Sequence, residues 1–272
     1  MHSDNDSLPD FTNPPVDETA FSIQFPPISG FDVRHFGLYW TIVRDEYPGF
    51  KVLPPIPNQM EIFGTAPAHQ YFLPFQLVAE PEIRCWFVDA SGTRLFQVQR
   101  DRFVHNWRKV IGNELYPRYP ASRDLLSSEW HRFCTFLEQQ GLNRPHVNQC
   151  EVTYINHIEY ERGWNNYGEL SKVITTWIEP SEPRFLPAPE RVNMEVHYSF
   201  PDNLGRLHVS LQPVIRARDG HEVLQLTMTA RGAPKSSASE DVLSWLDLGR
   251  AWVVKGFADF TTRKLQELWG RK

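Results

Sequence analysis

Three consecutive segments between residues 191 and 231 alternate apolar and polar side chains, and a long helical segment follows them. The segments read "RVNMEVHYSF", "RLHVSLQPVIRA" and "EVLQLTMTAR", and the turn-forming stretches "PDNLG" and "RDG" separate them. A period of two predicts strands that bury one face. That apolar face must be covered, so the pattern predicts an antiparallel sheet packed on a helix. The residues expected on it are Val192, Met194, Val196, Tyr198, Phe200, Leu207, Val209, Leu211, Leu224, Leu226 and Met228.

The expected covering helix is the long segment "DVLSWLDLGRAWVVKGFADFTTRKLQELWG", residues 241–270. Gly249 and Gly256 lie seven residues apart, on one face of it. A glycine inside a helix costs about 1 kcal/mol relative to alanine. A close approach of the helix to the sheet would explain both glycines, and simple tolerance is the alternative. The predicted apolar stripe is Trp245, Gly249, Trp252, Val253, Gly256, Phe257 and Phe260.

The first half of the chain shows a related order of elements. A strand at 18–25 precedes a helix from 33 to 47, which Asp32 can cap. After the proline-rich stretch 50–82, the turns "DASG" and "RDR" divide three strands in a meander. The segment "SSEWHRFCTFLEQQG" then predicts an amphipathic helix with a serine cap, and its final Gly141 suits the C′ position.

The second half begins with the strand "CEVTYINHIEY", and "GELSKVITTWIEP" predicts a helix ended by Pro180. Each half therefore reads β-α-β-β-β-α. We expect an α+β fold with a curved antiparallel sheet, in one domain of residues 16–272 whose halves are 16–145 and 146–272. Residues 1–15 would form a disordered or extended lead. Duplication explains the repeated order, and coincidence is the alternative. The order resembles the helix-grip and TATA-binding-protein-like architectures, which by themselves imply no function.

Composition excludes several classes of protein. The net charge of −5 argues against a strongly electrostatic nucleic-acid binder. No run of about 18 apolar residues predicts a membrane span, and the polar start "MHSDNDSLPDF" lacks the features of a secretory signal. Cys85, Cys134 and Cys150 lie far apart without C-x-x-C spacing. They are typical of reduced, buried thiols in a cytoplasmic protein, and they predict no zinc site.

The strand "VTYINHIEY" places the polar pair Asn156 and His157 side by side, next to Tyr154. Successive strand residues point to opposite faces, so the pair must divide between the two sides of the sheet. We expect at least one of them to be buried and hydrogen-bonded within the chain. The role is either structural pairing or contact with a ligand or partner.

Further candidates for binding lie in two other segments. In "LFQVQRDRFVHNWRK", Arg100 and Arg108 with Phe103 and Trp107 could meet an acidic or nucleotide ligand, or "RDR" could be a charged turn. The loop "ERGWNNYGEL" would display Trp164 for contact, or fold it back over the sheet as a lid.

On the outward face of the sheet, His197 and His208 with Glu195 could hold a metal. A solvated polar face is the expected reading, and no metal or cofactor is predicted. The chain also lacks G-x-S-x-G, H-E-x-x-H, G-x-x-x-x-G-K-[ST] and G-x-G-x-x-G motifs. No catalytic residue is therefore predicted, and the sequence favours a protein without catalytic activity.

Six segments of the chain follow one another in a distinctive order. They are "NPPVDETAFSIQF", "YPGF", "LFQVQRDRFVHNW", "EWHRF", "VTYINHI" and "LDLGRAWVVKGFADFTTRKLQELWG". In this respect the chain resembles a sporadically distributed bacterial family of unknown function. Its members carry a Pro-Pro-x-x-Glu start, a Tyr-Ile-Asn-Arg/His-Ile strand and a long C-terminal helix. The resemblance implies no activity. Its patchy distribution is typical of mobile or defence-associated genes.

Two hypotheses for function follow. The first is a cytoplasmic binding or adaptor protein with a protein partner, in a bacterial defence or mobile-element context. The alternative is a small-molecule-binding protein or enzyme, with an aromatic-lined cavity between the sheet and the C-terminal helix. Nucleic-acid binding through "RDRFVHNWRK" would need a contiguous basic surface, which the charge disfavours.

Overall fold

In the computed structural model, residues 8–63, 82–178 and 185–272 are described, and their strands form one nine-stranded sheet. The order across the sheet is β2-β3-β4-β5-β1-β6-β9-β8-β7. Every neighbouring pair is antiparallel, which confirms the α+β class with a large antiparallel sheet. The strands are β1 (Val16–Gln24), β2 (Gly49–Leu53), β3 (Arg84–Val88), β4 (Arg94–Gln99), β5 (Arg102–Arg108), β6 (Gln149–Ile158), β7 (Met194–Ser199), β8 (Arg206–Ile215) and β9 (Glu222–Gly232).

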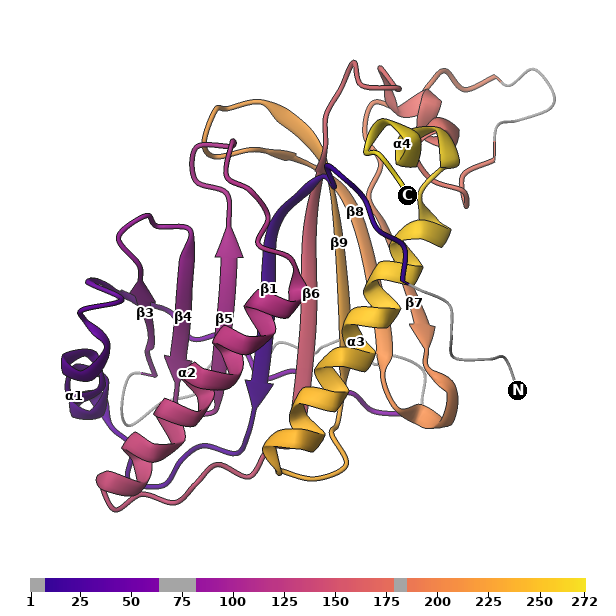
Figure 1. The fold of residues 1–272 in the computed structure, drawn as a ribbon. Coiled ribbons are helices and arrows are strands. Elements are labelled where there is room, and N and C mark those ends of the chain that lie inside the picture. Colours follow the sequence, from indigo (N-terminus) through magenta and orange to yellow (C-terminus); the bar gives the residue numbers. More distant parts are fainter. Residues whose placement is uncertain (1–7, 64–81, 179–184) are drawn as a thin grey trace.

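Two long helices lie on the same face of this sheet (Figure 1). Helix α2 (Tyr119–Gln139) contacts β5, and helix α3 (Ser239–Phe260) contacts β6 and β9. The shorter helix α1 (Val33–Val43) contacts β3, and α4 (Arg263–Leu268) follows α3 directly. The prediction that the last helix covers the strands of the second half is confirmed for β9. The edge strand β7 is covered less completely, since its Tyr198 side chain remains 39% exposed.

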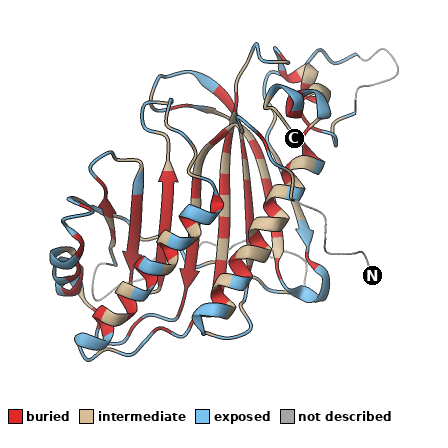
Figure 2. Cartoon of the chain, viewed as in Figure 1, coloured by how far each residue is buried: buried red, intermediate tan, exposed pale blue. Residues whose placement is uncertain are grey.

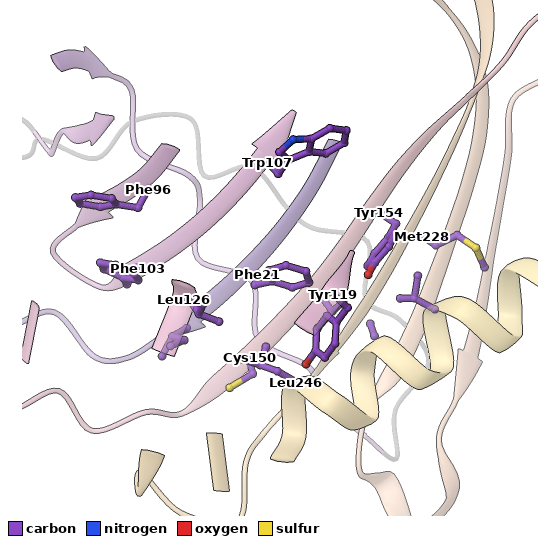
Figure 3. Close-up of a cluster of buried hydrophobic side chains, with 14 of the residues drawn as sticks. Phe21, Phe96, Phe103, Trp107, Tyr119, Leu126, Cys150, Tyr154, Met228 and Leu246 are labelled. Atoms are coloured by element: carbon purple, nitrogen blue, oxygen red, sulfur yellow. The ribbon is translucent and has the colours of Figure 1, made fainter. Parts of the chain in front are cut away.

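The core lies between the helices and the sheet, because apolar residues alternate onto that face. The cross-strand register aligns Phe96, His105, Phe21 and Val152 in one row, and Ala230 and Leu207 extend the row. Figure 2 shows the resulting alternation of buried residues along the central strands and the exposed outer faces of the helices. Figure 3 shows part of this core, with Phe21 beside Tyr119 and with Tyr154 toward α3.

Several local predictions are confirmed. Asp32 caps α1 by accepting from the Arg34 amide, and Gly141 has the positive φ of a helix C′ residue. The "DASG" turn joins β3 to β4, with Gly92 at φ +75°. The two α3 glycines do lie close to neighbouring strands. A Cβ at Gly249 would lie 3.2 Å from Val152 Cγ2, and one at Gly256 would lie 2.7 Å from Leu207 Cδ2.

Some predicted helices differ in the structure. The long C-terminal segment 241–270 is divided at Thr261 into α3 and α4. The segment "GELSKVITTWIEP" forms only a short 3₁₀ helix, η1 (Tyr167–Lys172), rather than an α-helix, and residues 179–184 at its predicted end lie outside the described residues. Residues 64–81 and 1–7 lie outside them as well. Helix α2 begins at Tyr119, earlier than the expected serine cap, because Pro120 suits the first helical turn.

The face of the sheet away from the helices is polar, and the segment that contains Ile56 and Glu61 covers part of it. The Gln99 side chain bonds the backbone N–H and C=O of Ile56, and Gln149 accepts from the Glu61 amide. The expectation of a solvated face concerns β7 and β8, and it is wrong where Glu61 covers Arg206 and His208. Glu61 itself forms ion pairs with three residues of β8 and β9, namely Arg206, His208 and Arg231.

These contacts decide the ionisation of Glu61. Burial alone would raise its pKa, but the hydrogen bond and charge of His208 and the charges of Arg231 and Arg206 lower it overall. His197 and His208 do stand opposite each other, with ring centroids 4.4 Å apart. No group of three or more possible metal ligands occurs among the residues that the structure describes.

The three cysteines are buried and unpaired, as predicted. Burial raises the pKa of the Cys85 thiol to about 12, so this thiol is protonated and unreactive at neutral pH. Within the described ranges, no helix has the length and apolar character needed to cross a membrane.

Candidate functional site

A pocket of about 350 Å³ lies between α3, the start of α2 and strand β6. Its walls combine aromatic rings with a few convergent polar groups, as small-molecule sites usually do. Its lining residues include Phe11, Tyr116, Arg118, Tyr119, Tyr154, Asn156, Arg250 and Phe257.

The N-terminal segment closes one side of the pocket and is held there by Arg118. The Arg118 guanidinium donates to the carbonyl oxygens of Phe11 and Thr12 and pairs with Asp10 at 3.1 Å. Phe11 is buried and packs edge-on against Phe257 of α3, with ring centroids 5.5 Å apart. The segment before β1 is therefore part of the pocket wall.

Two tyrosine hydroxyls meet at the floor of the pocket. Tyr116 Oη and Tyr154 Oη are 2.9 Å apart. Burial raises the pKa of both phenols above the ordinary value, and their mutual hydrogen bond adds to this effect for Tyr116. Both phenols are therefore neutral at physiological pH. One O–H is used in their mutual hydrogen bond, which leaves the other O–H available as a donor.

Arg250 of α3 brings a positive charge to the same pocket. Its guanidinium carbon lies 5.1 Å from the centre of the Tyr119 ring, a cation–π contact. It also opposes the rise in the pKa of Tyr154, which places it close to that hydroxyl. Arg250 Nε is buried and has no hydrogen-bond partner, and no carboxylate of the described residues forms an ion pair with it.

The neighbouring acid on α3 is already engaged. Asp247 accepts from Tyr119 Oη at 2.7 Å and from Arg123 Nε at 2.8 Å. Asp10 is likewise paired, with Arg118 and Lys272. The pocket thus keeps one guanidinium whose charge no neighbouring carboxylate balances.

Asn156 lies on the wall formed by β6. It is only 1% exposed, and its Nδ2 donates to the Leu226 carbonyl at 3.2 Å. His157 points to the other side of the sheet, 3.3 Å from Asp17. The prediction that the two residues occupy opposite faces, with at least one buried and bonded within the chain, is confirmed.

We expect Asn156→Ala to lower the free energy of unfolding by about 1–2 kcal/mol, because a buried hydrogen bond between β6 and β9 is lost. The melting temperature should fall by roughly 2–8 °C. Thermal unfolding followed by circular dichroism measures this, and Asn193→Ala, at an exposed position, is the control. An unchanged melting temperature would assign Asn156 to ligand contact instead.

The structure separates the residues that the sequence singled out. Tyr154 and Asn156 share the pocket under α3, whereas His157 and Arg108 line a second cavity on the other face. Arg100 lies in the β4–β5 turn and contributes its carbonyl oxygen to the Ile28 amide, away from both cavities.

Trp164 is not displayed for contact, which was one of the two alternatives for its loop. Its side chain is fully buried, stacks on Tyr160 and donates to the Glu159 carbonyl. Phe103 and Trp107 are also buried, so they are not placed to stack on nucleic-acid bases.

Sequence reasoning missed Tyr116 in the segment before α2, Tyr119 at the start of α2 and Arg250 in α3. The spacing of α3 contained one signal of the site. Arg250 lies four residues after Leu246 and three before Val253, on the same helical face as these apolar residues. A charged residue at a core-facing helical position needs a partner.

Comparisons with family models, curated proteins and solved structures find no match to this chain. Its function is therefore inferred from the residues and geometry of the site.

Proposed function

We propose that this protein binds a small, largely apolar organic molecule that carries a carboxylate, in the pocket under α3. The unbalanced Arg250 guanidinium is the observation that carries this proposal. A partly buried guanidinium without an acidic partner is costly, and a ligand carboxylate would satisfy it through charge-assisted hydrogen bonds.

The rest of the pocket suits the same ligand. One of the two neutral hydroxyls of Tyr116 and Tyr154 donates to the other, and the second can donate to a carboxylate oxygen. The rings of Phe11 and Phe257 offer an apolar wall. The proposal assigns binding and no chemical step, and it corresponds to the second of the two sequence-based hypotheses.

We also propose that the halves 16–145 and 146–272 arose by duplication, with a helix-grip or TATA-binding-protein-like arrangement. The sheet order supports this, because β5, β4 and β3 lie outward from β1 as β9, β8 and β7 lie outward from β6. Helices α2 and α3 follow β5 and β9. The extra strand β2 and the short η1 depart from the repeat. The pocket would then lie where the halves meet.

Titration with carboxylates tests the proposed function. Benzoate, indole-3-acetate and octanoate would each be titrated calorimetrically, beside the corresponding neutral amides. We expect at least one acid to bind and its amide to bind far more weakly. Arg250→Gln should weaken the binding of that acid roughly tenfold to hundredfold, since one charge-assisted interaction is lost.

Arg263→Gln is the matched control. Arg263 begins α4, is largely exposed and lies 3.6 Å from Glu267, so its loss should leave carboxylate affinity unchanged. Binding that Arg250→Gln does not weaken, or equal affinity for acid and amide, would contradict the proposal.

The adaptor hypothesis stays as a second candidate, favoured by a different surface. A groove of about 540 Å³ between α3 and strands β7 and β8 is lined by Tyr198, Trp252 and Leu248. Partly exposed apolar side chains of this kind often mark protein contacts. Under this proposal the chain acts in the bacterial cytoplasm, in a defence or mobile-element context. Co-purification at native expression level, repeated with Tyr198→Ser, tests it.

A further inference from the structure

A second cavity lies on the face of the sheet away from α2 and α3. One part, of about 500 Å³, and an adjoining part, of about 280 Å³, share five lining residues. The β8–β9 hairpin reaches back over the ends of β1 and β5 to form it (Figure 1). The shared residues are Asp17, Lys109, His157, Arg216 and Arg218.

Charged side chains are held in this cavity rather than displayed on the surface. Arg218 and Asp17 form an ion pair, and each side chain is only 15% exposed. His157 lies between Asp17 and Gln225, 3.3 Å from each. Holding charges away from water is unfavourable unless they are paired, so this cluster is a built feature of the fold.

A bulge in β1 creates the cluster. The register between β1 and β6 shifts between Val16 and Glu18, so Asp17 is the extra residue. An extra residue in a strand redirects a side chain, and here Asp17 reaches His157 and Arg218. Gly112 allows the hairpin to close, because Arg218 Nε would lie 3.1 Å from a Cβ there.

Cations exceed carboxylates in this cavity. Arg216 is paired with Glu159 and Asp219, and Arg218 with Asp17. Lys109 forms no ion pair with any carboxylate of the described residues, and burial lowers its pKa while Asp17 partly offsets the effect. Arg108 adds a further cation that is paired with no described acid and lies over the Trp86 ring.

We propose that this cavity binds a diphosphate group, with Lys109 and Arg218 as its principal contacts. The cavity has room for two linked phosphate groups, and several cations line it, whereas a single carboxylate would need only one. Arginine binds phosphate through two parallel hydrogen bonds, and lysine binds it as a compact charge. Lys109 and Arg218 do not line the carboxylate pocket, so the two proposals are independent.

Titration with inorganic pyrophosphate at constant ionic strength tests this proposal. We expect saturable binding to the full chain, and Lys109→Gln should weaken it roughly tenfold or more. Circular dichroism confirms that the variant is folded. If Arg218→Gln unfolds the hairpin, Lys109→Gln alone still decides the result. The control Arg263→Gln should bind pyrophosphate as the parent chain does.

A second arm repeats the titration with ATP, which carries the same group on a nucleoside. Tighter binding of ATP supports a nucleotide as the source of the diphosphate, and equal or weaker binding supports the diphosphate itself. Absence of saturable binding in both arms overturns the proposal. So does an affinity that Lys109→Gln leaves unchanged, because non-specific attraction to the surface would then explain the signal.

Discussion

Replacing Glu129 by alanine is expected to lower the free energy of unfolding by about 3–5 kcal/mol. Glu129 lies on the buried face of α2, and its carboxylate accepts from His105 Nδ1 at 2.8 Å and from the Tyr47 hydroxyl. His105 and Tyr47 are 1% and 2% exposed, so neither abandoned donor could turn to water. The melting temperature should fall by roughly 6–20 °C, measured by thermal and urea unfolding.

Two further variants show whether the lost acceptor is the cause. Glu129→Gln keeps one acceptor oxygen, so it should cost less than Glu129→Ala. Glu138→Ala, at an exposed position of the same helix, should change stability by less than about 0.5 kcal/mol. If Glu129→Ala proves as stable as Glu138→Ala, the buried hydrogen bonds contribute nothing to the fold.

Most elements could be predicted because their signals are local. The Asp32 cap, the turn at Gly92 and the alternation in β8 and β9 each depend on residues close together in sequence. The missing α-helix after Asn166 shows the limit of such signals. The apolar residues of that segment, Leu170, Val173 and Ile174, are buried without an α-helix, because tertiary contacts override a weak helical period.

The candidate site could be predicted only in part. Tyr154 and Asn156 belong to a distinctive strand, whereas Arg250 and Tyr116 meet them through the packing of α3 and the segment before α2. No spacing in the sequence relates these elements, since the pocket is defined by contacts between residues far apart in the chain. Arg118 adds a positive φ of 67° at the α2 cap, which a non-glycine residue rarely adopts.

Gly232→Ala is expected to lower the free energy of unfolding by about 3 kcal/mol or more. Gly232 ends β9, where β8, β9 and α3 come together. A Cβ there would lie 2.4 Å from the Leu204 carbonyl oxygen and 2.8 Å from Gly205 Cα, and both of these are backbone atoms. Rotating one side chain cannot relieve this strain, because the crowded atoms belong to the backbone. Trp245 also holds the Leu204 oxygen in place, since its Nε1 donates to that oxygen at 2.9 Å.

The matched control for this substitution is Gly37→Ala, and the two should have opposite signs. Gly37 lies inside α1, and a Cβ there meets nothing within 4 Å. Alanine should therefore raise stability by roughly 0.5–1 kcal/mol, since it restricts the unfolded chain and favours the helix. Urea unfolding of both variants measures the difference. Equal effects would mean that the β8–β9 junction yields to a methyl group, and that the short contacts around Gly232 do not constrain the position of α3.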